Sequence, residues 1–166
     1  MKSLILTTGL VAACFAQPLL ANPVGTPSSP WQAGINLGQH VFDSPFSSDN
    51  RSAAGAGFFV GYEIESGIQD VRSSVEAGYT QTKDFYRNSN TDIKSFWVAG
   101  VLQKRLPELN PNFSVLGRIG LDLGDDDGLF MGFGVAMQHQ ANIATRAEFI
   151  NKDATKVYQL SLLFSF

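Results

Sequence analysis

Val157-Tyr158-Gln159-Leu160-Ser161-Leu162-Leu163-Phe164-Ser165-Phe166 is the stretch that decides the fold class of this chain. Apolar and polar residues alternate along it, as in an extended strand whose successive side chains point to opposite faces. One face carries the apolar side chains of Tyr158, Leu160, Leu162, Phe164 and Phe166. In water such a strand at a free sheet edge would pair with other chains. In a closed barrel within lipid it is safe, because acyl chains cover the apolar face and neighbouring strands pair with both edges.

The first 21 residues have the composition of a secretory signal peptide. A short positive start, Met1–Ser3, precedes an apolar core from Leu4 to Ala13. That core is far shorter than the roughly 20 apolar residues of a membrane-spanning helix. We expect cleavage after Ala21, with Ala16 as the alternative, so that residues 22–166 form one domain. The segment that ends at Cys14 is similar to a lipobox, and lipidation there stays open.

Charge and cysteine content exclude several classes of function. The formal net charge is −3 and no basic patch stands out, so no nucleic-acid partner is expected. Cys14 is the only cysteine, which excludes disulfides and cysteine-based metal sites from the mature chain. No glycine-rich loop follows a strand and opens a helix, so no nucleotide cofactor is expected. Asp125-Asp126-Asp127 lacks the later glutamate of a calcium loop, and we interpret it as an anionic hairpin tip and not as a metal site.

Eight extended segments, all but the fourth with a clear period of two, predict eight strands. They are residues 31–41, 54–65, 71–82, 92–106, 113–123, 129–138, 143–150 and 157–166. The connections 42–53, 83–91, 124–128 and 151–156 alternate with the connections 66–70, 107–112 and 140–142. Outer-membrane barrels have longer loops outside and short turns in the periplasm, and an even number of strands then places both termini in the periplasm. The pattern predicts an all-β, eight-stranded, antiparallel, up-and-down transmembrane β-barrel.

The fourth segment can face lipid in two ways. Either Trp97, Ala99 and Val101 point outward, or the alternate residues Phe96, Val98 and Leu102 do. We prefer the first facing, because it turns Lys94 and Lys104 away from lipid.

The polar face of the strands carries glycines and charges, which favours a membrane barrel over a soluble one. A soluble small barrel has an apolar interior, whereas an eight-stranded membrane barrel has a polar interior just wide enough for side chains. The charged residues on this face have both signs, and we expect them to form a network that plugs the lumen. They are Glu63, Arg72, Glu76, Arg118, Asp122, Arg146 and Glu148. A selectivity ring in a narrow pore is the alternative, although open channels belong to barrels of roughly 16 strands.

These features together resemble the OmpA-like outer-membrane β-barrel superfamily. The resemblance rests on the signal peptide, the eight segments, the motifs Val75–Tyr79 and Ile143–Phe149, and the terminal Phe166. It implies contact with outer-membrane lipid and lipopolysaccharide, and recognition of the C-terminal strand by the barrel-assembly machinery. The apolar residues Tyr158, Leu160, Leu162, Phe164 and Phe166 would be that assembly signal. Because the sequence stops at the barrel, no peptidoglycan-binding domain and no cell-wall anchoring are expected.

Some barrels of this kind modify lipid A, which requires a nucleophile, a base and an orienting carboxylate. His139 is expected at the periplasmic rim, and His40 with Asp43 and Ser44 matches no motif, so no catalytic residues are predicted. A lipid A-modifying enzyme remains the alternative. The favoured function is structural, or an interaction of surface loops with a host, a phage or a neighbouring protein. Exposed aromatics and arginines make good contacts, and the candidates are Phe46, Arg51, Phe85, Tyr86 and Arg87.

Overall fold

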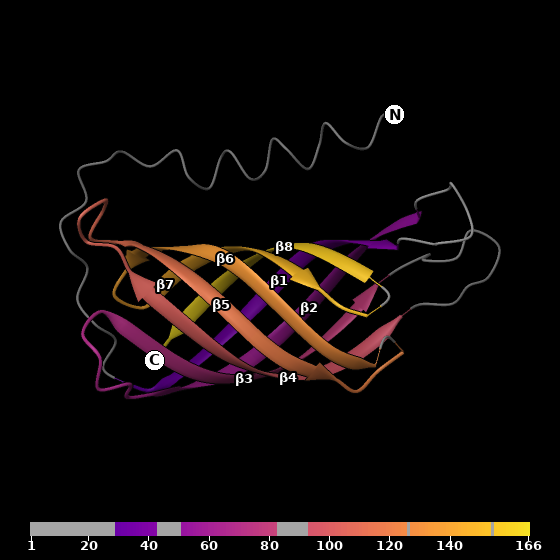
Figure 1. The fold of residues 1–166 in the computed structure, drawn as a ribbon, viewed down its shortest axis with the longest axis horizontal. Coiled ribbons are helices and arrows are strands. Elements are labelled where there is room, and N and C mark those ends of the chain that lie inside the picture. Colours follow the sequence, from indigo (N-terminus) through magenta and orange to yellow (C-terminus); the bar gives the residue numbers. More distant parts are fainter. Residues whose placement is uncertain (1–28, 43–50, 83–92, 126, 154) are drawn as a thin grey trace.

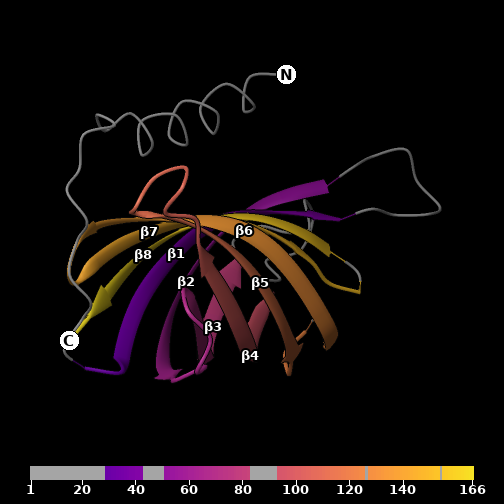
Figure 2. The same cartoon turned by 60° about the vertical axis from the view of Figure 1, so that its left-hand side comes forward.

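Eight antiparallel strands form a closed barrel in the computed structural model, which describes residues 29–42, 51–82, 93–125, 127–153 and 155–166 (Figure 1). The strands are β1 (Trp31–Phe42), β2 (Arg51–Ile64), β3 (Val71–Thr82), β4 (Lys94–Arg105), β5 (Phe113–Asp122), β6 (Gly128–Gln140), β7 (Ile143–Asn151) and β8 (Thr155–Ser165). Each strand pairs with the next along the chain, and β1 pairs with β8. The strands run obliquely around the barrel (Figure 2), as closure of a small barrel requires. Within the described residues, no helix is long and apolar enough to cross a bilayer.

The predicted fold class is confirmed, and the predicted strands differ from the observed ones mainly at their ends. β2 begins at Arg51 and not at residue 54, because its first residues pair with the end of β1, Ser52 opposite Val41. β6 extends to Gln140 across an irregularity in its pairing with β7. Backbone pairing needs no alternation of side chains, so these extensions leave no pattern in the sequence.

The side chains divide between an apolar outer surface and the lumen as predicted for seven of the eight strands. Ile35, Phe58 and Ile119 are more than half exposed on the outer surface. Their sequence neighbours Asn36, Phe59 and Arg118 are buried in the lumen. On β8, Tyr158 and Phe164 are exposed, as is Phe166 just beyond it, and Leu160 and Leu162 are half-buried. An outer surface of this kind is suited to acyl chains.

The facing that we preferred for the fourth strand is wrong. Trp97 is 4% exposed and lies inside the barrel, where Ala99 and Val101 are also buried, whereas Phe96 is 50% exposed on the outer surface. The preference rested on keeping lysines out of lipid. However, Lys94 and Lys104 lie at the two ends of β4. There a long side chain can extend beyond the apolar belt to water, so an outward lysine has little cost.

The two ends of the barrel carry different connections. At the end where β1 begins and β8 ends, here called the terminal end, the connections are residues 65–70, 106–112 and 141–142. At the opposite end, the loop end, β1, β3, β5 and β7 end, and residues 43–50, 83–93, 123–127 and 152–154 connect them to the strands that follow. Asp70, a residue with a positive φ of 60°, ties the turn 65–70 to the end of β4. Its carbonyl accepts a hydrogen bond from Arg105 N at 2.8 Å, and its carboxylate binds the Arg105 guanidinium at 3.3 Å.

Candidate functional site

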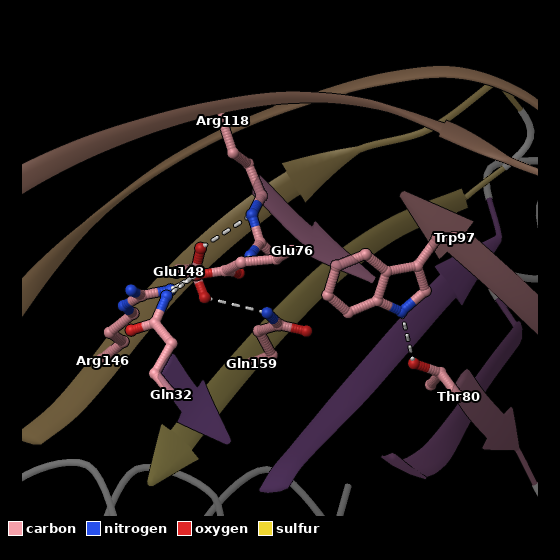
Figure 3. Close-up of polar contacts among 8 residues, drawn as sticks. All are labelled: Gln32, Glu76, Thr80, Trp97, Arg118, Arg146, Glu148 and Gln159. Carbon is pink, nitrogen blue, oxygen red and sulfur yellow. Dashed lines mark hydrogen bonds and ion pairs between the residues drawn. The ribbon is translucent and has the colours of Figure 1, made fainter. Parts of the chain in front are cut away.

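Four charged side chains from β3, β5 and β7 meet inside the lumen (Figure 3), and we call them the charge layer. They are Glu76, Arg118, Arg146 and Glu148. The centre is Glu76, which is fully buried. It accepts a hydrogen bond from Arg146 Nη1 at 2.6 Å, another from Arg118, and a third from Gln32 Nε2 at 3.1 Å. A buried carboxylate can stay ionised in such surroundings, because each of its oxygens is bound by a cationic donor.

Glu148 completes the charge layer on its other side. Arg118 Nε lies 3.3 Å from Glu148 Oε1, an ion pair without the geometry of a hydrogen bond. Gln159 Nε2 donates to Glu148 Oε2 at 2.9 Å (Figure 3). Two arginines thus face two glutamates, so the layer carries no net charge. It cannot present the single sign of charge that a selectivity ring requires.

The other predicted lumen charges lie outside this layer. Arg72 Nε and Glu63 Oε1 form a partly exposed pair, 3.6 Å apart, toward the terminal end. Asp122 lies toward the loop end and pairs with Lys152, which we had placed in a connection and not in the lumen. Lys152 follows β7 directly, and its side chain reaches back into the barrel. The one sequence signal for this contact was an inward-facing aspartate with no cation assigned to it.

Asp122, Lys152 and Ser95 form a second polar group, here called the loop-end cluster. The Asp122 carboxylate accepts hydrogen bonds from Lys152 Nζ and Ser95 Oγ, and from Gly124 N at 3.1 Å. Lys152 Nζ also lies 3.3 Å from Ser95 Oγ and 5.8 Å from the centre of the Phe130 ring. This cluster joins β4, β5 and the connection between β7 and β8 across the loop end.

Three aromatic side chains, here called the aromatic layer, fill the lumen beside the charge layer. The centres of the Phe59 and Trp97 rings are 6.0 Å apart, and those of Trp97 and Phe130 are 6.3 Å apart. They form one buried apolar cluster with Ala99, Ile150, Val157 and Leu163. Arg118 connects the two layers, because its guanidinium carbon lies 5.0 Å from the centre of the Trp97 ring. Trp97 Nε1 donates to Thr80 Oγ1 at 3.2 Å, so the indole has its polar partner (Figure 3).

Each ring of the aromatic layer lies over a glycine directly across the strand ladder. The pairs are Gly34 with Phe59, Gly78 with Trp97, and Gly120 with Phe130. A Cβ at any of these glycines would overlap the ring opposite. We had interpreted the lumen glycines as small residues in a cramped interior. The structure gives a more specific reason, since these three admit large rings.

A small cavity of about 20 Å³ lies within the lumen next to both layers. Its lining includes Trp97 and Phe130 of the aromatic layer, Arg118 of the charge layer, and His40 and Lys152 from the loop end. A volume of this size holds about one water molecule. The residues therefore leave no space for a small-molecule ligand in this part of the lumen.

Those of the remaining candidate residues that the structure describes do not assemble into a chemical site. Phe46, Phe85, Tyr86 and Arg87 lie outside the described residues, and Arg51 begins β2. His139 binds Thr145 Oγ1 through Nε2 at 2.9 Å near the terminal end. Asp125 accepts a hydrogen bond from Lys94 N at 2.8 Å. Among the residues that the structure describes, no three of His, Cys, Asp and Glu lie close enough together to hold a metal ion.

Comparison with known proteins agrees with the barrel. Residues 6–162 match the model of the outer membrane protein beta-barrel domain family. No curated protein matches the chain. Among solved structures, the crystal structure of Neisserial surface protein A has a TM-score of 0.55 at 17% identity, covering 83% of this chain and 98% of that one. The Yersinia pestis outer membrane protein Ail has a TM-score of 0.51 at 16% identity, covering 81% and 99%. A de novo designed transmembrane β-barrel has a TM-score of 0.57 at 12% identity, covering 86% and 99%. At these identities the likeness is one of fold.

Proposed function

This chain belongs to the outer membrane protein β-barrel family, and we propose that it is a closed barrel that acts through its surface loops and its lipid contacts. The observation that carries this proposal is the filled lumen. The charge layer has no net charge, and the aromatic layer packs against it. With the lumen occupied by its own side chains, the surfaces left for function are the outer belt and the loop end.

The orientation that we propose places both termini in the periplasm and the loop end outside the cell. Two connections at the loop end, residues 43–50 and 83–93, are longer than any at the terminal end, as in other outer-membrane barrels. The first 21 residues would direct export. The outward face of β8, with Phe164 and nearby Phe166 exposed, would be offered to the assembly machinery. The apolar belt would contact membrane lipid, including lipopolysaccharide in the outer leaflet.

The first test asks whether the folded protein conducts ions. Reconstituted in a planar bilayer, the wild-type protein should give a flat current, with folding shown by heat-modifiable mobility in a gel. Discrete, reproducible steps from protein folded in this way would favour the alternative of a narrow pore and overturn the proposal.

The second alternative is a lipid A-modifying enzyme. Against it stands the position of His40, which is buried in the lumen beside Lys152 and does not face the lipid. Mass spectrometry of lipid A from cells with the wild-type protein, and from cells with His40→Ala, should give identical spectra. A lipid A species that appears with the wild type and disappears with His40→Ala would establish the enzyme.

The third test concerns surface interaction with a host cell, a phage or a neighbouring protein. The name of a barrel with the same fold, the attachment invasion locus protein, connects that protein with attachment. In this chain the connection 83–93 contains Phe85, Tyr86 and Arg87, side chains that are favoured in contacts. Replacing residues 83–91 by a flexible linker should abolish binding to the target surface while heat-modifiable mobility is retained. The matched control replaces residues 123–127, and equal binding by both variants and the wild type would exclude residues 83–91 from the contact.

A further inference from the structure

We propose that the aromatic layer, and not the charge layer, is the barrier that makes the lumen impermeable to ions. The inference rests on the proposed closed barrel and identifies the residues that close it. It concerns Phe59, Trp97 and Phe130, which the charge network does not include.

The aromatic layer is part of a set of four cross-strand pairs, to which each of the eight strands contributes one residue. β1 and β2 supply Gly34 and Phe59, and β3 and β4 supply Gly78 and Trp97. β5 and β6 supply Gly120 and Phe130, and β7 and β8 supply Ile150 and Val157. The five large side chains belong to one buried apolar cluster, and the three rings lie over the three glycines. This cluster therefore brings large apolar side chains into the lumen from β2, β4, β6, β7 and β8.

An apolar constriction blocks ions more effectively than a charged one of similar width. A hydrophobic constriction expels water, and an ion that enters it must give up its hydration without receiving replacement ligands. Rings of charged side chains, by contrast, line the filters of many conducting channels. The cavity that borders Trp97 and Phe130 has a volume of about 20 Å³, enough for about one water but not for a hydrated ion.

The charge layer is better suited to stability than to sealing. Its arginines and glutamates can form ion pairs in more than one combination, as Glu76 binds two arginines and Arg118 binds two glutamates. Arg118 Nε and Glu148 Oε1 already face each other without a hydrogen bond. Glu76→Gln removes the charge of residue 76 but keeps a side chain of nearly the same volume. The aromatic layer beside the charge layer therefore stays unchanged.

Single-channel recording in planar bilayers tests the proposal on the full-length folded protein. Trp97→Ala and Phe130→Ala should each produce discrete current steps, with larger steps when the two are combined. Phe96→Ala is the matched control, because residue 96 is the lipid-facing neighbour of Trp97 on the same strand. Phe59→Ala can be tested alongside them, and its matched control is Phe58→Ala, because residue 58 is the lipid-facing neighbour of Phe59 on β2. These controls and Glu76→Gln should give a flat current like that of the wild type.

Heat-modifiable mobility in a gel confirms folding of every variant before recording, and Phe130→Ala keeps the test decisive if Trp97→Ala does not fold. Steps from Glu76→Gln together with a flat current from the folded aromatic variants would overturn the inference and leave the closed barrel intact. A flat current from all variants would also overturn it. Steps from the wild type would instead refute the closed barrel on which the inference rests.

Discussion

Trp97 lies directly across the β3–β4 ladder from Gly78, and its indole occupies the space that a Cβ at residue 78 would need. The relationship explains two features of the sequence together. A tryptophan can point into a narrow barrel only where the facing strand has no side chain, and a glycine within a strand is stabilised when a ring covers it. The same arrangement is repeated by Phe59 over Gly34 and by Phe130 over Gly120.

Gly78→Ala should destabilise the barrel, because the added methyl group displaces the indole of Trp97. Overpacking of this kind costs about 1–3 kcal/mol. Urea titration of the protein folded in lipid vesicles measures the change in the free energy of unfolding. Gly100→Ala is the control, since nothing lies within 4 Å of a Cβ at that outward position. It should be neutral or stabilising by about 0.5–1 kcal/mol, because a strand glycine is replaced by a residue with less conformational entropy to lose. Equal losses for both variants would contradict the packing argument.

Glu76→Gln should be among the most destabilising single changes in the lumen. It leaves Arg118 and Arg146 buried with Glu148 as their only carboxylate in the charge layer. Removing one partner of a buried ion pair costs about 3–5 kcal/mol. Glu63→Gln removes a partly exposed pair with Arg72 at 3.6 Å and should cost less than about 1 kcal/mol. The same urea titration compares the two, and a smaller loss for Glu76→Gln than for Glu63→Gln would show that the charge layer contributes little to stability.

The fold could be predicted from the sequence because a period of two records which face of each strand meets lipid. That pattern is clear on β8, where Phe164 and Tyr158 alternate with Ser165 and Gln159. It fails on β4, where residues 96–99 are all apolar. The predicted facing of β4 was therefore based on the lysines at the strand ends. It was wrong because a lysine at the end of a strand can reach water from either face.

The candidate site could be predicted only in part, for reasons that lie in pairing between strands. Residues on the polar face of a strand identify the charges of the lumen, which is how Glu76 and Arg146 were found. Which charges meet depends on the register of eight strands, and a single sequence does not report that register. The aromatic layer was missed because an apolar residue of the lumen can look like a lipid-facing one, as Trp97 did. Lys152 was missed because it belongs to a connection and not to a strand.

The facing of β4 predicts different lipid contacts for the two tryptophans of the chain. Trp31 is 51% exposed on the outer surface at the start of β1, where it packs edge-on against Tyr62 with ring centres 5.0 Å apart. In vesicles of lipid brominated near the headgroup, the fluorescence of Trp97→Phe, which retains Trp31, should be strongly quenched. The fluorescence of Trp31→Phe, which retains only the luminal Trp97, should be quenched much less. Stronger quenching of Trp97 than of Trp31 would contradict the observed facing of β4 and place Trp97 on the lipid side.

Lys152→Met should destabilise the loop end, and a second substitution should largely reverse the loss. With lysine removed, the Asp122 carboxylate stays buried and keeps only the Ser95 hydroxyl and the Gly124 amide as described partners. An uncompensated buried charge of this kind costs about 3–5 kcal/mol. The double variant Lys152→Met, Asp122→Leu removes both charges and places apolar side chains beside Phe130, which Lys152 already covers at 5.8 Å. Replacing a whole buried ion pair by apolar residues is often neutral or stabilising.

Urea titration of the wild type, both single variants and the double variant gives the interaction energy between the two positions. Lys94→Met is the matched control, because Lys94 is also at the loop end but is exposed on the outer surface, and its loss should change stability by less than about 0.5 kcal/mol. If the double variant is as unstable as Lys152→Met alone, the charges are needed for their hydrogen bonds to Ser95 and not merely for each other. Recovery in the double variant would show that the loss in Lys152→Met comes from leaving the buried charge of Asp122 uncompensated.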